Sequence, residues 1–326
     1  MGLGRGVPTP VRDPAGVRPE GASGVPQLEG PGQLTRWAGL LNLLVVYVGW
    51  SGTYVAIRFA VREGAGFPPF TLIAMRLMVA GAILVVWALW ARYRVIPTKS
   101  ELGLLIISSI LLWGGGNGLV VWAEQRAGAG YAALLVGTTP IWAAVIEALV
   151  DRRLPSRLLV FSLLCGLAGV GMLAAPVLMA GSVTDLIAII AVVGAALSWS
   201  GGSVLQARRP IPMTPIATAA LQHVIGGVFF VTAVLVAHEP APSPTAEAWW
   251  GWAYLVVFGS IITFTSFLRA LAMLPTSVVL TYSYVNPVGS VILAWLLLGE
   301  EITGWTLAGA ALVLLGVTGV FRARRN

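Results

Sequence analysis

Two charged side chains interrupt long apolar segments of this sequence: Arg76 in TLIAMRLMVAGAIL and Glu147 in IWAAVIEALV. A charge inside an apolar helix is costly to bury, so it is a functional-site hypothesis by default. The two residues lie at different depths of their segments, and we therefore do not expect them to pair. Arg76 is predicted to face Glu124 or a substrate carboxylate. Glu147 is predicted to pair with Arg152 or Arg153, near the end of its segment.

Proton transfer is a second interpretation of Glu147, because a lone buried carboxylate can exchange a proton near neutral pH. His223 lies inside another apolar segment and can do the same. A hydrogen bond between packed helices is the alternative role for this imidazole. Glu147 and His223 are therefore the candidates for proton coupling.

Aromatic and polar residues form a stripe on two further apolar segments. Residues three and four apart share a face of a helix. The stripes with this spacing are Tyr47, Trp50, Tyr54 and Arg58 in one segment and Trp199, Ser203 and Gln206 in the other. Two interpretations are open: the rings line a cavity, or they pack between helices. Trp50 lies about 15 Å into its segment, too deep for an interfacial aromatic belt. We predict that Trp50, Tyr54, Trp199 and Gln206 contact a substrate.

Asn117 stands among four glycines in LLWGGGNGLVVWAEQ and shares a helix face with Trp113 and Glu124. The glycines allow a neighbouring backbone to come close and allow the helix to bend. An asparagine inside a bilayer must find hydrogen-bond partners. Contact between Asn117 and a substrate is one interpretation, and a bond to a neighbouring helix is the other.

Pro140 and Pro287 interrupt two more apolar segments, in TTPIW and VNPVG. Each proline removes the hydrogen bond to the carbonyl four residues earlier, at Val136 and Ser283, and a freed carbonyl is a polar ligand. We predict that both prolines are hinges, although a kink can also serve only to fit a neighbouring helix. The candidate substrate contacts beside them are Thr138, Trp142, Tyr282 and Asn286, with Thr139 and Tyr284 as neighbours.

The composition indicates a membrane protein. Of 326 residues, 57% are hydrophobic and 10% are charged, and the mean hydropathy is +0.87; soluble domains carry about 25% charge. The net charge of +7 is spread over scattered arginines, so no nucleic-acid surface is expected. Cys165 is the one cysteine, which excludes an internal disulfide, and His223 and His238 lack metal-ligand spacing. No metal or other cofactor is expected.

Ten apolar segments of about the 20 residues that a bilayer requires follow one another from Trp37. Residues 1–36 are rich in proline and glycine and are predicted to form a disordered cytoplasmic tail. The segments are 37–58, 70–90, 102–122, 131–150, 157–175, 185–206, 215–237, 249–270, 276–298 and 303–321, with the eighth and ninth divided at Leu274 and Pro275. With the N-terminus inside, sixteen of the twenty Lys and Arg residues are cytoplasmic, so both termini are placed in the cytoplasm.

Short sequence motifs from the first half of the chain recur in the second half. WSGTYVAIR at 50–58 returns as WSGGSVLQAR at 199–208, an offset of 149 residues. TTPIWAAVIEALV is answered by VNPVGSVILAWLL at an offset of 147, and GLAGVGM is answered by LLGVTGV at the same offset. The matches predict two repeats of five helices, at 37–178 and 179–326. Because five is odd, the second repeat is inverted in the membrane, as in many secondary transporters.

Several of these motifs resemble those of a known protein family. WSGTYVAIRFAV, GNGLVVWAEQ, GYAALLVGTTPIW, SWSGGSV, FGSII and SYVNPVGSVILAWLLLGEE are similar to the drug/metabolite transporter superfamily, in its ten-helix branch with two EamA domains. The resemblance covers about residues 37–321. It implies a bacterial inner-membrane carrier, usually an exporter of amino acids, metabolites or drugs, without a cofactor. The first repeat departs from this pattern at one place, because DRR at 151–153 stands where the second repeat has LGE at 298–300.

A transporter is the predicted function, with a small-molecule solute and the lipid bilayer as partners. No converging nucleophile, base or metal cluster is present, and no GxxxxGK[ST] motif, so an enzyme is not expected. The alternative is a membrane sensor or scaffold without transport activity, which would need a soluble domain or a long loop. Tryptophan and tyrosine walls with few charges fit a small amphipathic solute such as an amino acid or a drug-like compound. These residues do not specify substrate identity, coupling ion or oligomeric state.

Overall fold

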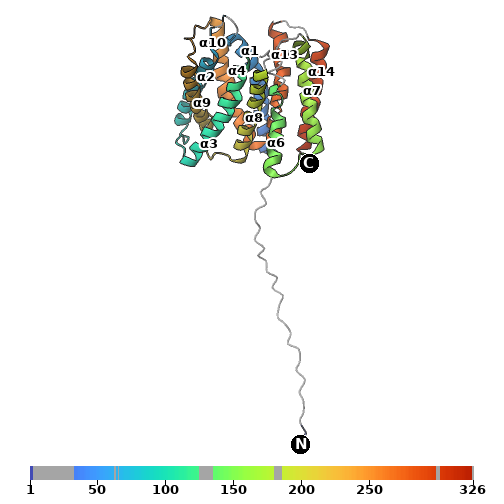
Figure 1. Cartoon of the computed structure of the whole chain (residues 1–326). Helices are drawn as coiled ribbons and strands as arrows, with labels where there is room; N and C mark the ends of the chain where they lie inside the picture. Colours follow the sequence, from blue (N-terminus) through green and yellow to red (C-terminus); the bar gives the residue numbers. More distant parts are fainter. Residues whose placement is uncertain are drawn as a thin grey trace.

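A computed structural model describes residues 1–2, 33–61, 64, 66–124, 135–179, 186–298 and 302–324. Every regular element among these residues is a helix, and the helices stand side by side in one bundle (Figure 1). They are α1 (Gln33–Val61), α2 (Pro69–Trp90), α3 (Lys99–Ser109), η1 (Ile110–Gly118), α4 (Leu119–Glu124), α6 (Thr139–Asp151), α7 (Arg157–Met179), α8 (Leu186–Arg208), α9 (Pro215–Ala237), α10 (Ala246–Tyr254), η2 (Leu255–Ile262), α11 (Thr263–Met273), α12 (Thr276–Val279), α13 (Tyr282–Leu298) and α14 (Gly304–Ala323). Residues 3–32 of the predicted tail lie outside the described residues. Residues 33–36 belong to α1, which corrects the predicted boundary.

Eight helices among the described residues are long and apolar enough to cross a membrane. They correspond to eight of the ten predicted segments. The other two segments, the fourth and the ninth, contain shorter helices: α6 has 13 residues, and α13 has 17 and follows the four-residue α12. The division predicted at Leu274 and Pro275 is present, because Leu274 is extended and α12 begins at Thr276. An all-helical multi-pass architecture is confirmed, and the count of ten stays a prediction.

Large apolar side chains cover the outside of the bundle. Phe161 on α7 and Leu235 on α9 are each 69% exposed, and Leu314 on α14 is 58% exposed. Helices that are apolar on their outer as well as their inner faces are typical of membrane spans. The exposed faces therefore fit contact with lipid tails.

Helices α7 and α14 pack at very close range through glycine. Gly166 lies against Gly316, and Gly169 lies against Val313. A Cβ on Gly169 would lie 2.6 Å from the backbone nitrogen of Val313, so glycine is what allows this approach. Because contacts that advance along α7 go backwards along α14, the two helices are antiparallel.

Helices α2 and α9 form a second close antiparallel pair. Leu77 of α2 lies against Gly226 of α9, and Gly81 of α2 lies against Val224. Just beyond α9, the Glu239 carboxylate accepts hydrogen bonds from two backbone N–H groups in the first turn of α2, at 2.7 and 2.9 Å. A carboxylate is favourable at this end of a helix, where N–H groups have no helical partner.

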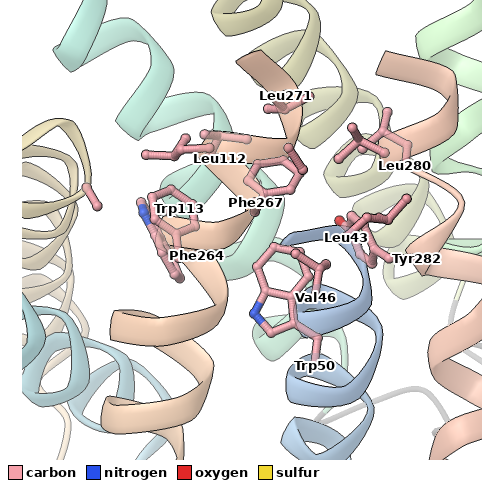
Figure 2. Packing of buried hydrophobic residues seen from close by; sticks show 14 of the residues in the cluster. Leu43, Val46, Trp50, Leu112, Trp113, Phe264, Phe267, Leu271, Leu280 and Tyr282 are labelled. Atoms are coloured by element: carbon pink, nitrogen blue, oxygen red, sulfur yellow. The ribbon is translucent and has the colours of Figure 1, made fainter. Parts of the chain in front are cut away.

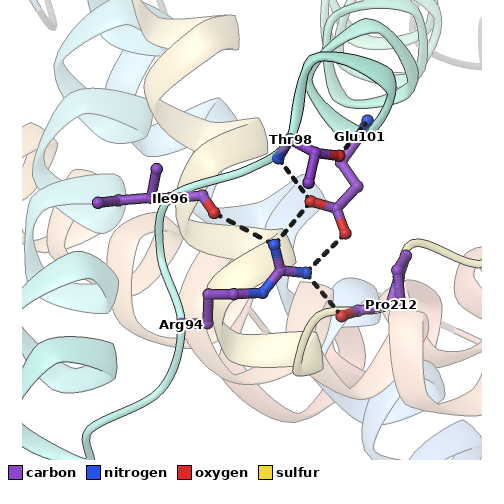
Figure 3. Close-up of polar contacts among 5 residues, drawn as sticks. All are labelled: Arg94, Ile96, Thr98, Glu101 and Pro212. Carbon is purple, nitrogen blue, oxygen red and sulfur yellow. Dashed lines mark hydrogen bonds and ion pairs between the residues drawn. The ribbon is translucent and has the colours of Figure 1, made fainter.

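The opposite end of this pair is tied by Arg94, in the connection between α2 and α3 (Figure 3). Its guanidinium donates to both Glu101 carboxylate oxygens, at 2.6 and 2.8 Å, and to the Pro212 carbonyl oxygen ahead of α9. Glu101 in turn accepts from the Thr98 backbone N–H, and together they form a capping box that begins α3. The contact therefore joins the ends of α2, α3 and α9.

The remaining helices exchange partners between the two halves of the chain. Helix α1 packs against the continuous run α10–η2–α11 and against α13, whereas α8 packs against η1 and α4, which continue from α3, and against α6. Both runs contain a π-helical stretch, η1 or η2. A π-helix has wider turns than an α-helix and is often found at functional sites. Helices α1 and α8 thus occupy matched surroundings at the centre of the bundle.

The close contact of α7 with α14 predicts that Gly169→Ala lowers the thermal unfolding midpoint of the protein in detergent. The added methyl group would overlap the α14 backbone, and overpacking of this kind costs about 1–3 kcal/mol.

Gly201→Ala is the matched control, because nothing lies within 4 Å of a Cβ at this helical glycine. It is expected to be neutral or to stabilise by up to about 1 kcal/mol, since alanine favours the helix. Equal midpoints for the two variants would contradict the close contact.

Candidate binding pocket

A pocket lies inside the bundle, and both halves of the chain contribute to it. Its cavity volume is about 110 Å³, below the roughly 300–1,000 Å³ of typical small-molecule sites. The lining residues are Trp50, Thr53 and Ile57 of α1; Arg76 of α2; Trp113, Gly116, Asn117, Val120 and Val121 of η1 and α4; Val136 and Thr139 at the start of α6; Ala195, Ala196 and Trp199 of α8; and Tyr282 and Asn286 of α13. Six of the ten predicted substrate contacts are among them.

A cluster of aromatic rings closes one end of the pocket. The Trp50 ring centroid is 4.6 Å from that of Tyr282, 5.3 Å from that of Phe267 and 5.6 Å from that of Trp199. Figure 2 shows Trp50, Phe267 and Tyr282 together, with Leu271 beyond them. Trp50 meets Tyr282 and Trp199 edge-on and Phe267 at a tilt, arrangements that aromatic pairs prefer over face-to-face stacking.

The direction of the pocket follows from the residues of α1. Trp50, Thr53 and Ile57 line it on successive turns, whereas Val46, one turn before Trp50, is fully buried and outside the lining. The pocket is therefore closed toward the N-terminal half of α1 and extends toward its C-terminal half.

The two tryptophans that the sequence repeat pairs contact opposite π-helical stretches. Trp50 Nε1 donates a 3.0 Å hydrogen bond to the Gly259 carbonyl oxygen in η2. The Trp199 ring packs against Gly116 of η1, where a Cβ would lie 2.7 Å from the ring. Trp199 Nε1 is buried, and no described residue accepts a hydrogen bond from it. The two rings thus pack on opposite π-helical stretches, but only the indole N–H of Trp50 has an acceptor among the described residues.

Four buried polar atoms of the lining have no hydrogen-bond partner among the described residues. They are Trp113 Nε1, Asn117 Oδ1, Trp199 Nε1 and Asn286 Oδ1. An unpartnered buried polar group costs about 1–3 kcal/mol, and inside a bilayer water does not compensate it. The arrangement is therefore suited to a polar group supplied from outside the chain.

Arg76 brings the positive charge of the lining. It is 5% exposed, and its Nε donates a 2.7 Å hydrogen bond to Ser260 Oγ. The guanidinium carbon lies 5.5 Å from the centre of the Trp113 ring, which is a cation–π contact. The structure places Ser260 rather than an acid beside Arg76, and the side chain of Glu124, its predicted partner, lies outside the described residues.

Four predicted contacts lie elsewhere or outside the described residues. The Thr138 hydroxyl donates to the Leu135 carbonyl and is not in the lining, where its neighbour Thr139 takes part instead. Trp142 and Gln206 are half-buried away from the pocket. The side chain of Tyr54 lies outside the described residues.

The two prolines differ in their structural setting. Pro140 occupies the first turn of α6, where its missing N–H costs nothing, so it begins a helix and does not bend one. The Val136 carbonyl that it was expected to leave free accepts a 2.6 Å hydrogen bond from the Thr139 hydroxyl. Pro287 lies inside α13, between Asn286 of the lining and the C-terminal part of the helix. A hinge role for both stays a prediction.

Glu147 lies outside the pocket, in an ion pair with Arg324 at 2.5 Å. The predicted pairing with Arg152 or Arg153 is therefore wrong. Arg324 ends α14 on the same side of the bundle as the end of α6, a neighbour that sequence distance does not reveal. Asp151, at the end of α6, pairs with Arg208 of α8 at 2.6 Å.

His223 is fully buried on α9 and is not part of the pocket lining. Its Nδ1 lies 2.7 Å from the Ala219 carbonyl oxygen, and its ring centroid is 4.9 Å from that of Trp113. The position fits the helix-packing interpretation of this imidazole, directly behind the pocket wall.

Some lining residues were not among the predicted contacts. Trp113 lies four residues before Asn117, so the helical spacing placed it on the right face without assigning it a role. Thr53 of the lining had no distinguishing signal, and neither had Ser260, which is outside the lining and holds Arg76, because short hydroxyl residues are common in apolar helices. Ser260 reaches the site only because η2 packs against α2.

Known proteins resemble this chain over most of its length. The sequence profile of the EamA-like transporter family matches residues 37–175 and again residues 186–322. The chain is 30% identical over 277 residues to the "Uncharacterized inner membrane transporter YedA" of Escherichia coli (strain K12), covering 84% of this chain and 86% of that protein. It is 24% identical to the "Uncharacterized transporter YoaV" of Bacillus subtilis (strain 168), over 85% and 94%. A crystal structure titled "Crystal structure of protein" matches with a TM-score of 0.76 at 20% identity, covering 89% of this chain and 99% of that chain, so the fold is shared.

Because only one of the two paired tryptophans has an acceptor for its N–H among the described residues, replacing each by phenylalanine is expected to lower the free energy of unfolding by different amounts. Trp50→Phe is expected to lower the free energy of unfolding by about 1–3 kcal/mol, because it leaves the buried Gly259 carbonyl without its donor. The measurement is the thermal unfolding midpoint in detergent.

Trp199→Phe serves as the matched control. It removes an N–H group that has no partner among the described residues, so it should be much milder than Trp50→Phe. A larger loss for Trp199→Phe than for Trp50→Phe would overturn the assignment of the Trp50 hydrogen bond.

Proposed function

The chain belongs to the EamA-like transporter family, and from this premise we propose that it carries a small amphipathic solute across the membrane by alternating access. Membership supports a transporter role in a multi-pass membrane protein, and the relatives are named inner-membrane or uncharacterized transporters. The observation that carries the proposal is the pocket between the two halves of the chain, with aromatic walls and four polar atoms that have no partner among the described residues. Small-molecule sites combine apolar walls with a few polar groups in this way.

Ten helices in two inverted repeats, 37–178 and 179–326, are the architecture that we propose for this carrier. The two separate family matches support the division. At the repeat offset of 147 residues, Gly166 is equivalent to Val313 and Gly169 is equivalent to Gly316. The contact of Gly166 with Gly316 is therefore equivalent to the contact of Gly169 with Val313. Both contacts exist, and the two helices run antiparallel, as equivalent helices of an inverted repeat must when they pair across the axis.

The exchange of partners at the centre supports the same proposal. Helix α1 packs on η2 and α13, and α8 packs on η1 and α6, so each central helix contacts the corresponding elements of the other half. Transporters of this class bind the solute at the interface between repeats and move one against the other. The pocket lies at that interface.

One end of the pocket is closed, which we assign to the cytoplasmic side. Below the aromatic rings, the Tyr47 hydroxyl lies 2.6 Å from the Thr281 hydroxyl, joining α1 to the break before α13. The ends of α2, α6, α8 and α14 on this side carry arginines, including Arg208 and Arg324, in keeping with the positive-inside rule. Opening toward this side would separate the rings and the ion pairs of Arg208 and Arg324.

Both termini are then cytoplasmic, and the membrane is the bacterial inner membrane, as YedA's name states for that relative. Export is the direction that the family resemblance implies. Proton coupling through Glu147 or His223 stays a prediction, which a pH gradient tests. A sensor or scaffold without transport is the alternative function.

Counterflow in proteoliposomes tests the carrier. Vesicles are preloaded in turn with each amino acid, a sugar panel and a cationic dye, with and without an imposed pH gradient. Exchange of any one solute supports a carrier, and a response to the gradient supports proton coupling. Folded protein that exchanges none of them favours the sensor or scaffold.

Trp199→Ala is expected to slow exchange about 2- to 10-fold, because an aromatic contact with the solute is worth about 0.5–1.5 kcal/mol. Trp250→Ala is the matched control: this tryptophan is 77% exposed on α10, away from the pocket. Equal rates in the two variants, at equal folded yield, would contradict a role of Trp199 in the site.

A further inference from the structure

We propose that Arg76 binds the carboxylate of the solute, and that the solutes of this pocket are small monocarboxylates with an apolar or aromatic body. The inference rests on the proposed carrier function and adds the chemical class of the solute.

The Arg76 side chain is held from one side. Ser260 Oγ accepts from Nε at 2.7 Å, and Ser260 is itself fully buried, so this contact fixes the guanidinium plane. Gly259 provides the room: a Cβ there would lie 3.0 Å from Arg76 Nη2. The Trp113 ring supports the guanidinium at 5.5 Å. An arginine fixed in this way presents its two Nη groups as planar hydrogen-bond donors that can bind one carboxylate together.

The Nη groups of Arg76 have no acceptor among the described residues, and no described carboxylate forms an ion pair with this side chain. Other arginines of the structure are paired within the chain: Arg94 with Glu101, Arg208 with Asp151 and Arg324 with Glu147. These three are a third or more exposed, whereas Arg76 is the deeply buried arginine of the described residues.

A buried charge without a partner is strongly unfavourable, and inside a membrane such a charge marks a path for substrate or ions. The partner that the Nη groups of Arg76 lack among the described residues is therefore expected from the solute. A carboxylate matches the planar fork of the guanidinium through two parallel hydrogen bonds. Arg76 lines the pocket, so a bound carboxylate can reach it.

The other lining residues indicate the charge and polarity of the part of the solute outside its carboxylate. Among the described residues, the lining holds no second cation for another anionic group and no acid for a separate cation. The Trp50, Trp199 and Tyr282 rings offer apolar surface, and Asn117 and Asn286 offer an unpartnered amide oxygen each. A monocarboxylate with an aromatic or branched aliphatic body fits this set. An α-amino group is compatible with the asparagines but is not required.

Paired carboxylates and amides test the inference on the full-length protein in detergent. The probes are 3-phenylpropionate, 4-methylpentanoate and phenylalanine, each compared with its own primary amide, and the readouts are the thermal unfolding midpoint and a tryptophan-fluorescence titration. At least one acid is expected to bind about tenfold more tightly than its amide, a difference of about 1.4 kcal/mol. Arg76→Gln is expected to reduce this preference to about twofold or less, and Arg76→Lys to retain part of it.

Arg324→Gln is the matched control, because this arginine is paired with Glu147 outside the pocket and its loss should leave the preference intact. If Arg76→Gln does not fold, Arg76→Lys and Ser260→Ala carry the test, and both should weaken the preference. Equal binding of every acid and its amide would overturn the inference. An undiminished preference in Arg76→Gln, or in both Arg76→Lys and Ser260→Ala, would also overturn it.

The counterflow experiment separates this inference from the carrier function. Exchange of a neutral or cationic solute by protein that binds no carboxylate would overturn the carboxylate site and leave the carrier in place. Carboxylate binding that depends on Arg76, in protein that exchanges no solute, would support the site and count against transport.

Discussion

Polar groups inside the bilayer must find their partners within the protein or in a ligand, and this constraint explains much of the bundle. The Ser51, Ser200 and Ser203 hydroxyls donate to the carbonyls four residues earlier, at 2.6 to 2.7 Å. Trp50 reaches the Gly259 carbonyl, and Gln222 donates to Ser108. The pocket gathers four of the buried polar atoms that the described residues leave without partners, and it adds the guanidinium of Arg76, whose Nε alone has an acceptor among them.

Close backbone contact is the second feature of the architecture. Glycines bring α7 onto α14 and α2 onto α9, and other glycines in η1 and η2 make room for Trp199 and for Arg76. Lipid tails are as apolar as leucine, so helices in a membrane associate through tight packing more than through hydrophobic burial. The glycine positions therefore determine which helices meet, and the meeting of α1 and α8 with opposite π-helical stretches places the site between the two halves of the chain.

Much of the candidate site could be predicted from sequence, because helical spacing decides which side chains share a face. Trp50, Trp199, Tyr282 and Asn286 were assigned in this way and line the pocket. Trp142 was proposed only because it stands beside Pro140, and it lies outside the lining. The prediction also failed for Glu147, whose partner comes from the far end of the chain.

The sequence by itself determined the helical class, the membrane setting, most helix boundaries and the family, because hydropathy, helical spacing and repeated words are local properties of the chain. Only the tertiary structure decided that Ser260 holds Arg76, that the N–H of Trp50 but not that of Trp199 has an acceptor among the described residues, and which end of the pocket is closed. These facts depend on contacts between residues about 180 to 210 positions apart. Apolar helices of similar composition can pack in many ways, so spacing along one helix cannot select the neighbour that each face meets.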